Sequence, residues 1–266
     1  ADVQTRWKEA NFIKTGGKFL QFLFPPRCPV CDDLLEAAEV RNGEWTHRKC
    51  KTKLKPVGDN VCYHCGRPVR REKQEYCHDC TRGIQQKQSP YWKGTPFSCY
   101  QQGKALFLYQ DEAKKMMYRF KYGNRRTYAD FFADEAQKQY GDWITGKSVE
   151  AVVPVPMYRK KEKQRGYNQA DVFAKKLADA LGLAYEPAAV QRIVDTKPQK
   201  ELGDEERKNN LKNAFHVEKF IVKYKYILLV DDIYTTGSTA EAVARQLLAA
   251  GVEKVFFLSV CIGNGY

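Results

Sequence analysis

The side chains best suited to chemistry are eight metal ligands in the first third of the chain. They form four pairs with two residues between the members of each pair: Cys28 and Cys31, His47 and Cys50, Cys62 and Cys65, and Cys77 and Cys80. Zn²⁺ takes four thiolate or imidazole ligands in a tetrahedron, and two such pairs supply one complete set. The sequence therefore predicts two zinc ions, one bound by three cysteines and a histidine and the other by four cysteines.

Two arrangements of these pairs are compatible with the spacing. In a sequential arrangement the first pair joins the second and the third joins the fourth, whereas a cross-braced arrangement joins first with third and second with fourth. The loop lengths favour the sequential arrangement. Both sets are complete, while a catalytic zinc keeps one coordination position open, so we assign both ions to folding. His64 and His78 lie inside the third and fourth pairs, and we expect neither to bind metal.

A second group of candidate residues follows an apolar run near the end of the chain. Residues 227–230 are followed by Asp231 and Asp232, then by a Thr-Thr-Gly-Ser-Thr turn at 235–239 and a helical run from Ala240. Open parallel sheets bind ligands at the carboxyl ends of their strands. Backbone N–H groups at the start of a helix bind phosphate, and acids suit sugar hydroxyls or a metal shell. This segment predicts a ligand that carries a polyol and a phosphate.

A cation-rich loop is predicted after another apolar run. Residues 149–155 are typical of a short buried strand, and the segment that follows contains Arg159, Lys160 and further lysines up to Arg165. Taken alone, such a loop is typical of a solvated surface. Beside a phosphate-binding turn, it would instead supply cations to a second anionic group.

These groups need an alternating set of strands and helices to bring them together. Strands are predicted at 105–109, 149–155, 226–230 and 254–261, and helices at 111–121, 128–140, 168–181 and 239–250. Gly123 and Gly182 are expected to end two of the helices. Strict alternation predicts an α/β fold with a parallel sheet. The segment 141–148 has the Walker A spacing, but it lies between a helix and a strand, the reverse of a P-loop, and is expected to be a helix-to-strand loop.

Length and composition set the domain organisation. At roughly 100–200 residues per domain, 266 residues favour two domains. The chain is 43% hydrophobic and 29% charged, which excludes disordered, collagen-like and coiled-coil classes. We expect an N-terminal arm at 1–27, a double zinc-binding domain at 28–93 and an α/β domain at 94–266, with the boundary near Gly94.

The charge balance favours polyanionic partners. Lysine and arginine total 45 against 32 acidic residues, for a net charge of +13, which seven thiolates and two Zn²⁺ would lower to about +10. Between positions 116 and 128, cations alternate with aromatic residues, a combination that lets bases stack beside a positive groove. The predicted single-stranded DNA contacts are Arg119, Lys121, Arg125 and Arg126, although some of the neighbouring aromatics must belong to a core. A second candidate patch is Arg67, Arg70, Arg71 and Lys73.

The cysteine usage and the absence of export signals predict a cytoplasmic protein. Cysteines at metal-ligand spacing are typical of reducing compartments. No run approaches the ~18 apolar residues of a membrane-spanning helix, and no secretory signal opens the chain.

The segment at 227–239 resembles the phosphoribosyl pyrophosphate (PRPP) motif of type I phosphoribosyltransferases. In that motif, hydrophobic residues precede two acids and a Thr-Thr-Gly-x-Thr turn. The resemblance implies that PRPP is bound by Asp231, Asp232, Thr235, Thr236, Gly237, Ser238 and Thr239. The acids would hold the ribose hydroxyls, and the turn would hold the 5′-phosphate.

Further motifs are similar to those of the ComF (ComFC) competence-protein family. They are Pro-Val-Pro at 154–156, Arg-Gly-Tyr-Asn-Gln at 165–169, the ending Gly-Asn-Gly-Tyr, the mobile-loop segment at 196–210 and the zinc ligands upstream. His47 stands where many relatives have cysteine, and zinc accepts either. The resemblance implies a type I phosphoribosyltransferase fold behind a double zinc finger. It also implies a pyrophosphate loop at Tyr158, Arg159 and Lys160, and mobile-loop residues Lys197 and Lys200.

Two functions follow from this resemblance. The first is a competence protein that handles single-stranded DNA during natural transformation on a scaffold that binds PRPP with Mg²⁺, with partners such as a ComFA-like helicase. The alternative is an active phosphoribosyltransferase that transfers phosphoribose from PRPP to an unknown acceptor and releases pyrophosphate. Likeness of fold alone does not establish turnover.

Overall fold

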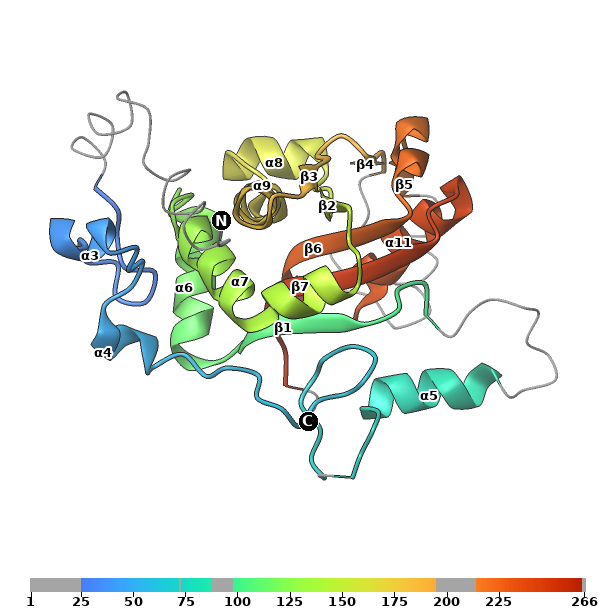
Figure 1. Ribbon diagram of the computed structural model, residues 1–266, viewed down its shortest axis with the longest axis horizontal. Helices are drawn as coiled ribbons and strands as arrows, with labels where there is room; N and C mark the ends of the chain where they lie inside the picture. Colours follow the sequence, from blue (N-terminus) through green and yellow to red (C-terminus); the bar gives the residue numbers. More distant parts are fainter. Residues whose placement is uncertain (1–24, 72, 88–97, 195–213, 265–266) are drawn as a thin grey trace.

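A five-stranded parallel sheet forms the centre of the molecule (Figure 1). The computed structural model describes residues 25–71, 73–87, 98–194 and 214–264. The strand order is β1-β7-β6-β2-β3. The strands are β1 Gly103–Leu108, β2 Ala151–Pro154, β3 Ala184–Tyr185, β6 Tyr226–Tyr234 and β7 Lys254–Ile262. All four neighbouring pairs are parallel, which confirms the predicted parallel α/β fold.

The described helices of the α/β part are α6 Asp111–Tyr122, α7 Tyr128–Gly146, α8 Arg159–Arg165, α9 Gln169–Leu181 and α11 Ser238–Ala250. Four of these five helices lie close to their predicted positions, and α8 was not predicted. Gly123 and Gly182 end α6 and α9 as predicted. Helix α7 continues six residues past the predicted end at Tyr140. The prediction of a loop at 141–148 was therefore wrong for most of that segment, which is helical and leads into β2.

The prediction of a cation-rich loop was wrong, because the structure has helix α8 in its place. Arg159–Arg165 consists only of Arg, Lys, Glu and Gln, which are all good helix formers. Gly166 follows in a left-handed conformation with φ 85°, and its N–H bonds the Glu162 carbonyl, so the helix ends there.

Helices cover both faces of the sheet, as its fully buried strands require. Ile227, Leu228, Leu229 and Val230 of β6 are all 0% exposed. Leu228 and Val230 belong to the core formed with α6, α7 and α9, whereas Ile227 and Leu229 belong to the core formed with α11. Strand β6 therefore delivers the residues that follow it to the edge of a rigid, two-sided core.

A smaller element lies beside this sheet. Strands β4 Val190–Arg192 and β5 Phe215–Val217 pair antiparallel, and the 3-10 helix η2 Lys219–Lys223 follows. The predicted mobile-loop residues Lys197 and Lys200 fall between the two strands and lie outside the described residues.

The cysteine-rich segment runs along the β1 side of the sheet, from helices α3 and α4 to α5 (Figure 1). These helices are α3 Ala37–Arg41, α4 Arg48–Lys51 and α5 His78–Lys87. The Leu108 N–H donates to the Lys55 carbonyl at 2.9 Å, and Pro56 forms an antiparallel bridge with Phe107. This connection covers the outer edge of β1, which would otherwise expose unpaired backbone groups. Much of the predicted arm at 1–27, and the predicted boundary at Gly94, lie outside the described residues.

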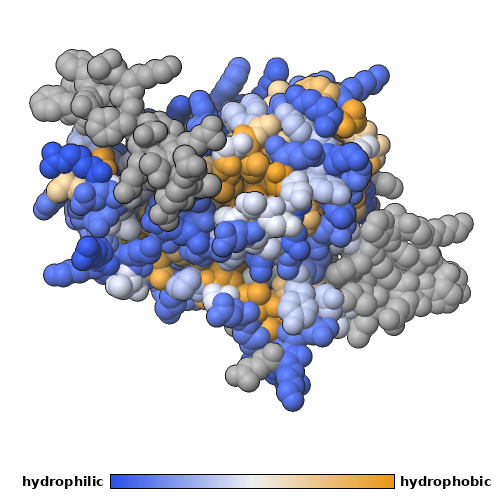
Figure 2. Space-filling model, viewed as in Figure 1, coloured by the Kyte–Doolittle hydropathy of each residue, from blue (hydrophilic) through white to orange (hydrophobic). Residues whose placement is uncertain are grey.

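The visible face of the molecule is mostly hydrophilic, with apolar residues in smaller areas between polar side chains (Figure 2). Among the residues that the structure describes, no helix combines the length and apolar character needed to cross a membrane.

Candidate metal centres and phosphate-binding site

The eight predicted metal ligands lie in two compact clusters, and the grouping is sequential. One cluster contains Cys28, Cys31, His47 and Cys50, and the other contains Cys62, Cys65, Cys77 and Cys80. Within each cluster the ligand atoms lie within 4.8 Å of one another. Tetrahedral zinc with Zn–S bonds of ~2.3 Å places its ligand atoms roughly 3.5–3.8 Å apart. The 3.6 Å between the Cys65 and Cys77 sulfurs and the 3.4 Å between Cys31 Sγ and His47 Nδ1 fit that tetrahedron.

His47 has the surroundings of a metal-bound imidazole. Its Nδ1 faces the sulfurs of Cys31 and Cys50, at 3.4 and 4.0 Å. Its Nε2 lies 3.3 Å from the Leu34 carbonyl and 3.6 Å from a Glu39 carboxylate oxygen. A carbonyl or carboxylate on the far nitrogen of a zinc-bound histidine fixes the tautomer and the ring orientation. The donor set of the first cluster therefore fits Zn²⁺.

His64 lies outside the ligand set but contacts the second cluster. Its Nδ1 is 3.4 Å from Cys80 Sγ, and its ring stacks on Tyr100 with centroids 4.4 Å apart. His64 is buried and packs beside the cysteine cluster.

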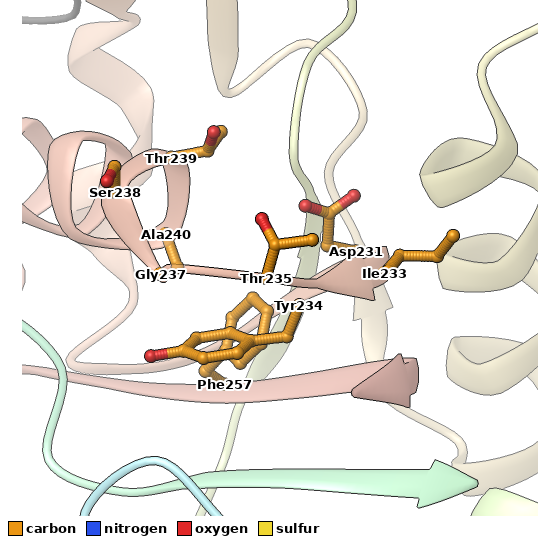
Figure 3. A pocket seen from close by; sticks show the side chains of 9 residues that line it. All are labelled: Asp231, Ile233, Tyr234, Thr235, Gly237, Ser238, Thr239, Ala240 and Phe257. Atoms are coloured by element: carbon orange, nitrogen blue, oxygen red, sulfur yellow. The ribbon is translucent and has the colours of Figure 1, made fainter. Parts of the chain in front are cut away.

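Asp231, the first of the two acids, and the turn line a shallow, open hollow (Figure 3). Strand β6 continues through Asp231 and Asp232 to Tyr234, four residues beyond its predicted end. Asp231, Thr235 and Thr239 point to the same side in Figure 3, while the rings of Tyr234 and Phe257 lie on the opposite side of the strand. The turn then enters α11 at Ser238, where the backbone N–H groups of the first helical turn and the helix dipole favour an anion.

Gly237 is required at the turn for two reasons. Its φ of 79° is unfavourable for other residues, and a Cβ there would overlap the Tyr234 hydroxyl. Thr236 Oγ1 lies 2.9 Å from Ser238 Oγ, so two hydroxyls of the turn already contact each other.

Lys121 neutralises part of the acid pair, a contact that sequence reasoning missed. Its Nζ lies 3.0 Å from Asp232 Oδ2, and both side chains are largely buried. Burial alone would lower the pKa of Lys121, but the Asp232 carboxylate more than offsets that effect and raises it. Burial, together with the Asp232 charge, raises the pKa of Asp231 to about 8. Asp232 therefore has a cationic partner, whereas the ionised form of Asp231 is disfavoured.

Known proteins resemble this chain over most of its length. A family model described as a double zinc ribbon domain matches residues 19–81. Competence protein F of Haemophilus influenzae is 32% identical over 239 residues, which cover 86% of this chain and 93% of that protein. The chain belongs to the competence protein F family. Competence protein ComFC of Bacillus subtilis is 26% identical over 204 residues, covering 76% of this chain and 77% of the relative. DNA utilization protein YhgH of Escherichia coli is 36% identical over 110 residues, covering 41% and 48% of the two chains.

The matching ribbon domain spans all eight ligands, so the two clusters are structural zinc sites of this family member. We name them the first zinc site, with His47, and the second zinc site, with four cysteines.

All four cations predicted to contact DNA have partners inside the protein, and three of them are also partly buried. Arg125 forms two hydrogen bonds to the Asp32 carboxylate, at 2.8 and 2.7 Å. Arg119 donates to the Pro29 and Val30 carbonyls, and Lys121 pairs with Asp232 as described above. Only Arg126 of the four is exposed, and its guanidinium lies over the Tyr167 ring while donating to the Gly166 carbonyl at 2.8 Å.

The remaining predicted site residues are also partly exposed and partly buried. Tyr158 precedes α8, and Arg159 and Lys160 are exposed in its first turn. Arg70, Arg71 and Lys73 of the second candidate patch are exposed, but Arg67 is only 6% exposed and cannot belong to that surface.

Proposed function

We propose that this family member handles single-stranded DNA during natural transformation on a scaffold that binds PRPP with Mg²⁺. The names of its relatives, Competence protein F and DNA utilization protein, support a role in competence and DNA use. The acid pair at the end of β6, followed by a hydroxyl-rich turn at the start of α11, carries the PRPP part of the proposal.

PRPP would lie across the hollow of Figure 3. The turn from Thr235 to Thr239 would hold the 5′-phosphate, and Asp231 and Asp232 at the end of β6 would hold the ribose hydroxyls. Tyr158, Arg159 and Lys160 would bind the pyrophosphate. Bound Mg²⁺ would neutralise the pyrophosphate charge, and the same acids offer it oxygen ligands. Calorimetric titration of the zinc-loaded full chain with PRPP and Mg²⁺ tests this part, and the absence of binding would refute it.

DNA would bind to a face formed by α6, the connection after α6, and α8, which we call the tyrosine face. It consists of Tyr118, Tyr122, Arg126 and Arg165. Tyr118 and Tyr122 are 66% and 59% exposed, and their ring centroids are 5.1 Å apart. The Arg165 guanidinium lies 5.3 Å from the Tyr122 ring centre. Exposed aromatic rings beside cations stack bases without sequence preference.

The salt dependence of DNA binding tests the tyrosine face. If about four to six phosphates are neutralised at ~0.7 counterions each, raising salt from about 50 to 200 mM should weaken binding roughly 50- to 300-fold. Replacing Arg126 and Arg165 by glutamine should reduce that slope, because it removes two cations. Fluorescence anisotropy with labelled oligothymidine measures the slope.

Truncation of the two tyrosines tests stacking separately. Tyr118→Ala with Tyr122→Ala should weaken binding by about 10-fold or more, since a stacked base contributes ~1–3 kcal/mol. Phe220→Ala is the matched control, because Phe220 is an exposed aromatic of another element. Equal affinities of the tyrosine variant and the control would place the DNA elsewhere, with Arg70, Arg71 and Lys73 as the next candidates.

Phosphoribosyl transfer is the second candidate function. The hollow beside the acid pair is the observation in its favour, since an acceptor could approach the ribose there. Release of pyrophosphate from PRPP on addition of an acceptor would establish this activity.

A further inference from the structure

Arg67 joins the second zinc site to the phosphate turn. It follows the Cys62–Cys65 pair by two residues, and its side chain is only 8% exposed. Its Nη1 lies 2.5 Å from an Asp79 carboxylate oxygen, and Asp79 stands between Cys77 and Cys80. Its Nη2 donates to the backbone carbonyl of Thr235, the first residue of the turn. One guanidinium therefore contacts both halves of the zinc site and the turn.

A second set of contacts runs in parallel with this one. The hydroxyls of Tyr100 and Tyr234 are 2.8 Å apart, and Tyr234 is the residue before the turn. Tyr100 stacks on His64, whose Nδ1 lies 3.4 Å from Cys80 Sγ. The Arg67 guanidinium also lies 5.8 Å from the Tyr234 ring centre. The turn thus rests on the second zinc site through two independent side chains.

The chemistry of Arg67 suits it to this position. The Arg67 guanidinium and the Asp79 carboxylate form an ion pair, with Nη1 2.5 Å from the carboxylate oxygen. Guanidinium N–H groups diverge in a rigid planar fork, which fixes two acceptors relative to each other. A lysine ammonium has no such fixed directions.

Anchoring the Thr235 carbonyl orients the next N–H group. No peptide bond among the described residues is cis. In a trans peptide the C=O and N–H point in opposite directions. Because Arg67 holds the Thr235 C=O toward the second zinc site, the N–H of Thr236 points away from that site. Backbone N–H groups of such a turn are the donors that bind phosphate.

We propose that Arg67 is a positioning residue of the phosphate turn and that the second zinc site sets the turn's phosphate affinity through it. This inference rests on the proposed phosphate-binding function of the turn. Arg67 does not touch the ligand; it fixes the peptide that does.

The test compares Arg67→Gln with Arg71→Gln in the zinc-loaded full chain. Arg71 is an exposed arginine of the same zinc ribbon and serves as the matched control. Calorimetric titration with ribose 5-phosphate should show affinity reduced about 10- to 100-fold in Arg67→Gln, the typical effect of losing a hydrogen bond to a charged group. The zinc content should stay at two ions per chain, and Arg71→Gln should match the wild type. Unchanged affinity in Arg67→Gln with both zinc ions bound would overturn the proposal.

A milder variant covers the case in which Arg67→Gln does not fold. Asp79 is 55% exposed, so Asp79→Asn removes only the outer partner of Arg67. It should weaken ribose 5-phosphate binding several-fold and shift the Thr236 and Gly237 amide resonances. Unchanged affinity together with unchanged resonances would also overturn the proposal.

The amide resonances separate this proposal from the function on which it rests. If the wild type does not bind ribose 5-phosphate, the proposed function fails. The resonances of Thr236 and Gly237 should still shift in Arg67→Gln and not in Arg71→Gln. If they do not shift, Arg67 does not position the turn.

Discussion

The two zinc sites have similar ligand spacing but pack against opposite faces of the sheet. Cysteines of the first site join the core of α6, α7 and α9, whereas those of the second site join the core of α11. Arg119 of α6 donates to the backbone of the first site's ribbon, and Arg125, in the connection after α6, donates to Asp32 of that ribbon. The second site is fastened to the phosphate turn by Arg67.

This difference shows that two zinc sites with similar ligands can have different roles, because they contact different surfaces of the protein. The first site holds the helix that carries Lys121 and the exposed Tyr118 and Tyr122. The second site supports the turn at the start of α11. Both connect the ribbon to the proposed ligand site, the first through the acid pair and the second through the turn.

Substitution of a single zinc ligand should have the largest effect of the changes predicted here, and its consequences should differ between the two sites. Cys31→Ser and Cys65→Ser should each lower the zinc content from two ions to one and remove on the order of 10 kcal/mol of local folding free energy. Only Cys65→Ser should weaken ribose 5-phosphate binding by about 10-fold or more, because it removes the support of the turn. Metal analysis and calorimetry measure both quantities. Equal losses of affinity in the two variants would show that the two sites do not differ in their effect on the turn. A zinc content near zero in the reduced wild type would refute both zinc sites.

Removal of the acid pair should abolish ligand binding without disturbing either zinc site. Asp231→Ala with Asp232→Ala removes the groups proposed to hold the ribose, so PRPP binding should fall below detection while two zinc ions remain. Calorimetry and metal analysis on the same sample check this. PRPP affinity equal to that of the wild type would show that the motif has another role.

Loss of Lys121 should destabilise the α6 side of the molecule. In Lys121→Met, Asp232 stays buried without its cation, and such a break typically costs about 3 kcal/mol. The double variant with Asp232→Asn removes the stranded charge and should recover much of that loss. Chemical unfolding at saturating zinc measures the three midpoints. Identical midpoints for the single and double variants would mean that the ion pair contributes nothing to stability.

The pH dependence of stability should report on Asp231. Its pKa is raised to about 8 in the folded chain, whereas an unfolded aspartate titrates near 4. The folded state therefore holds an extra proton between these values. The contribution of Asp231 is complete below about pH 4 and is lost as the pH rises through about 8. Unfolding free energy should fall by at most about 1.4 kcal/mol per pH unit in this window, and Asp231→Asn should flatten the curve.

The sequence by itself determined the features that depend on local spacing. The zinc ligands, the apolar run before Asp231 and the turn at 235–239 are visible because neighbouring residues must present ligands or enter a helix together. Alternating apolar segments likewise predicted the parallel sheet, since a strand buried on both faces is apolar throughout. Helix α8 was not predicted, because its cations suggested a loop. Gly166, which ends that helix, was therefore not recognised as a helix end.

Only the tertiary structure decided which charged side chains are exposed and which are buried against protein partners. The sequence does not distinguish Arg119, Lys121, Arg125 and Arg126. In the structure the first three are partly buried against their partners, whereas Arg126 is exposed. Arg67 reads as part of a basic patch, yet it contacts a carbonyl 168 residues away. The partner of a long cationic side chain depends on which face of the sheet its element packs against. Two zinc ribbons that differ little in ligand spacing therefore end on opposite faces with different neighbours, and local spacing carries no information about that choice.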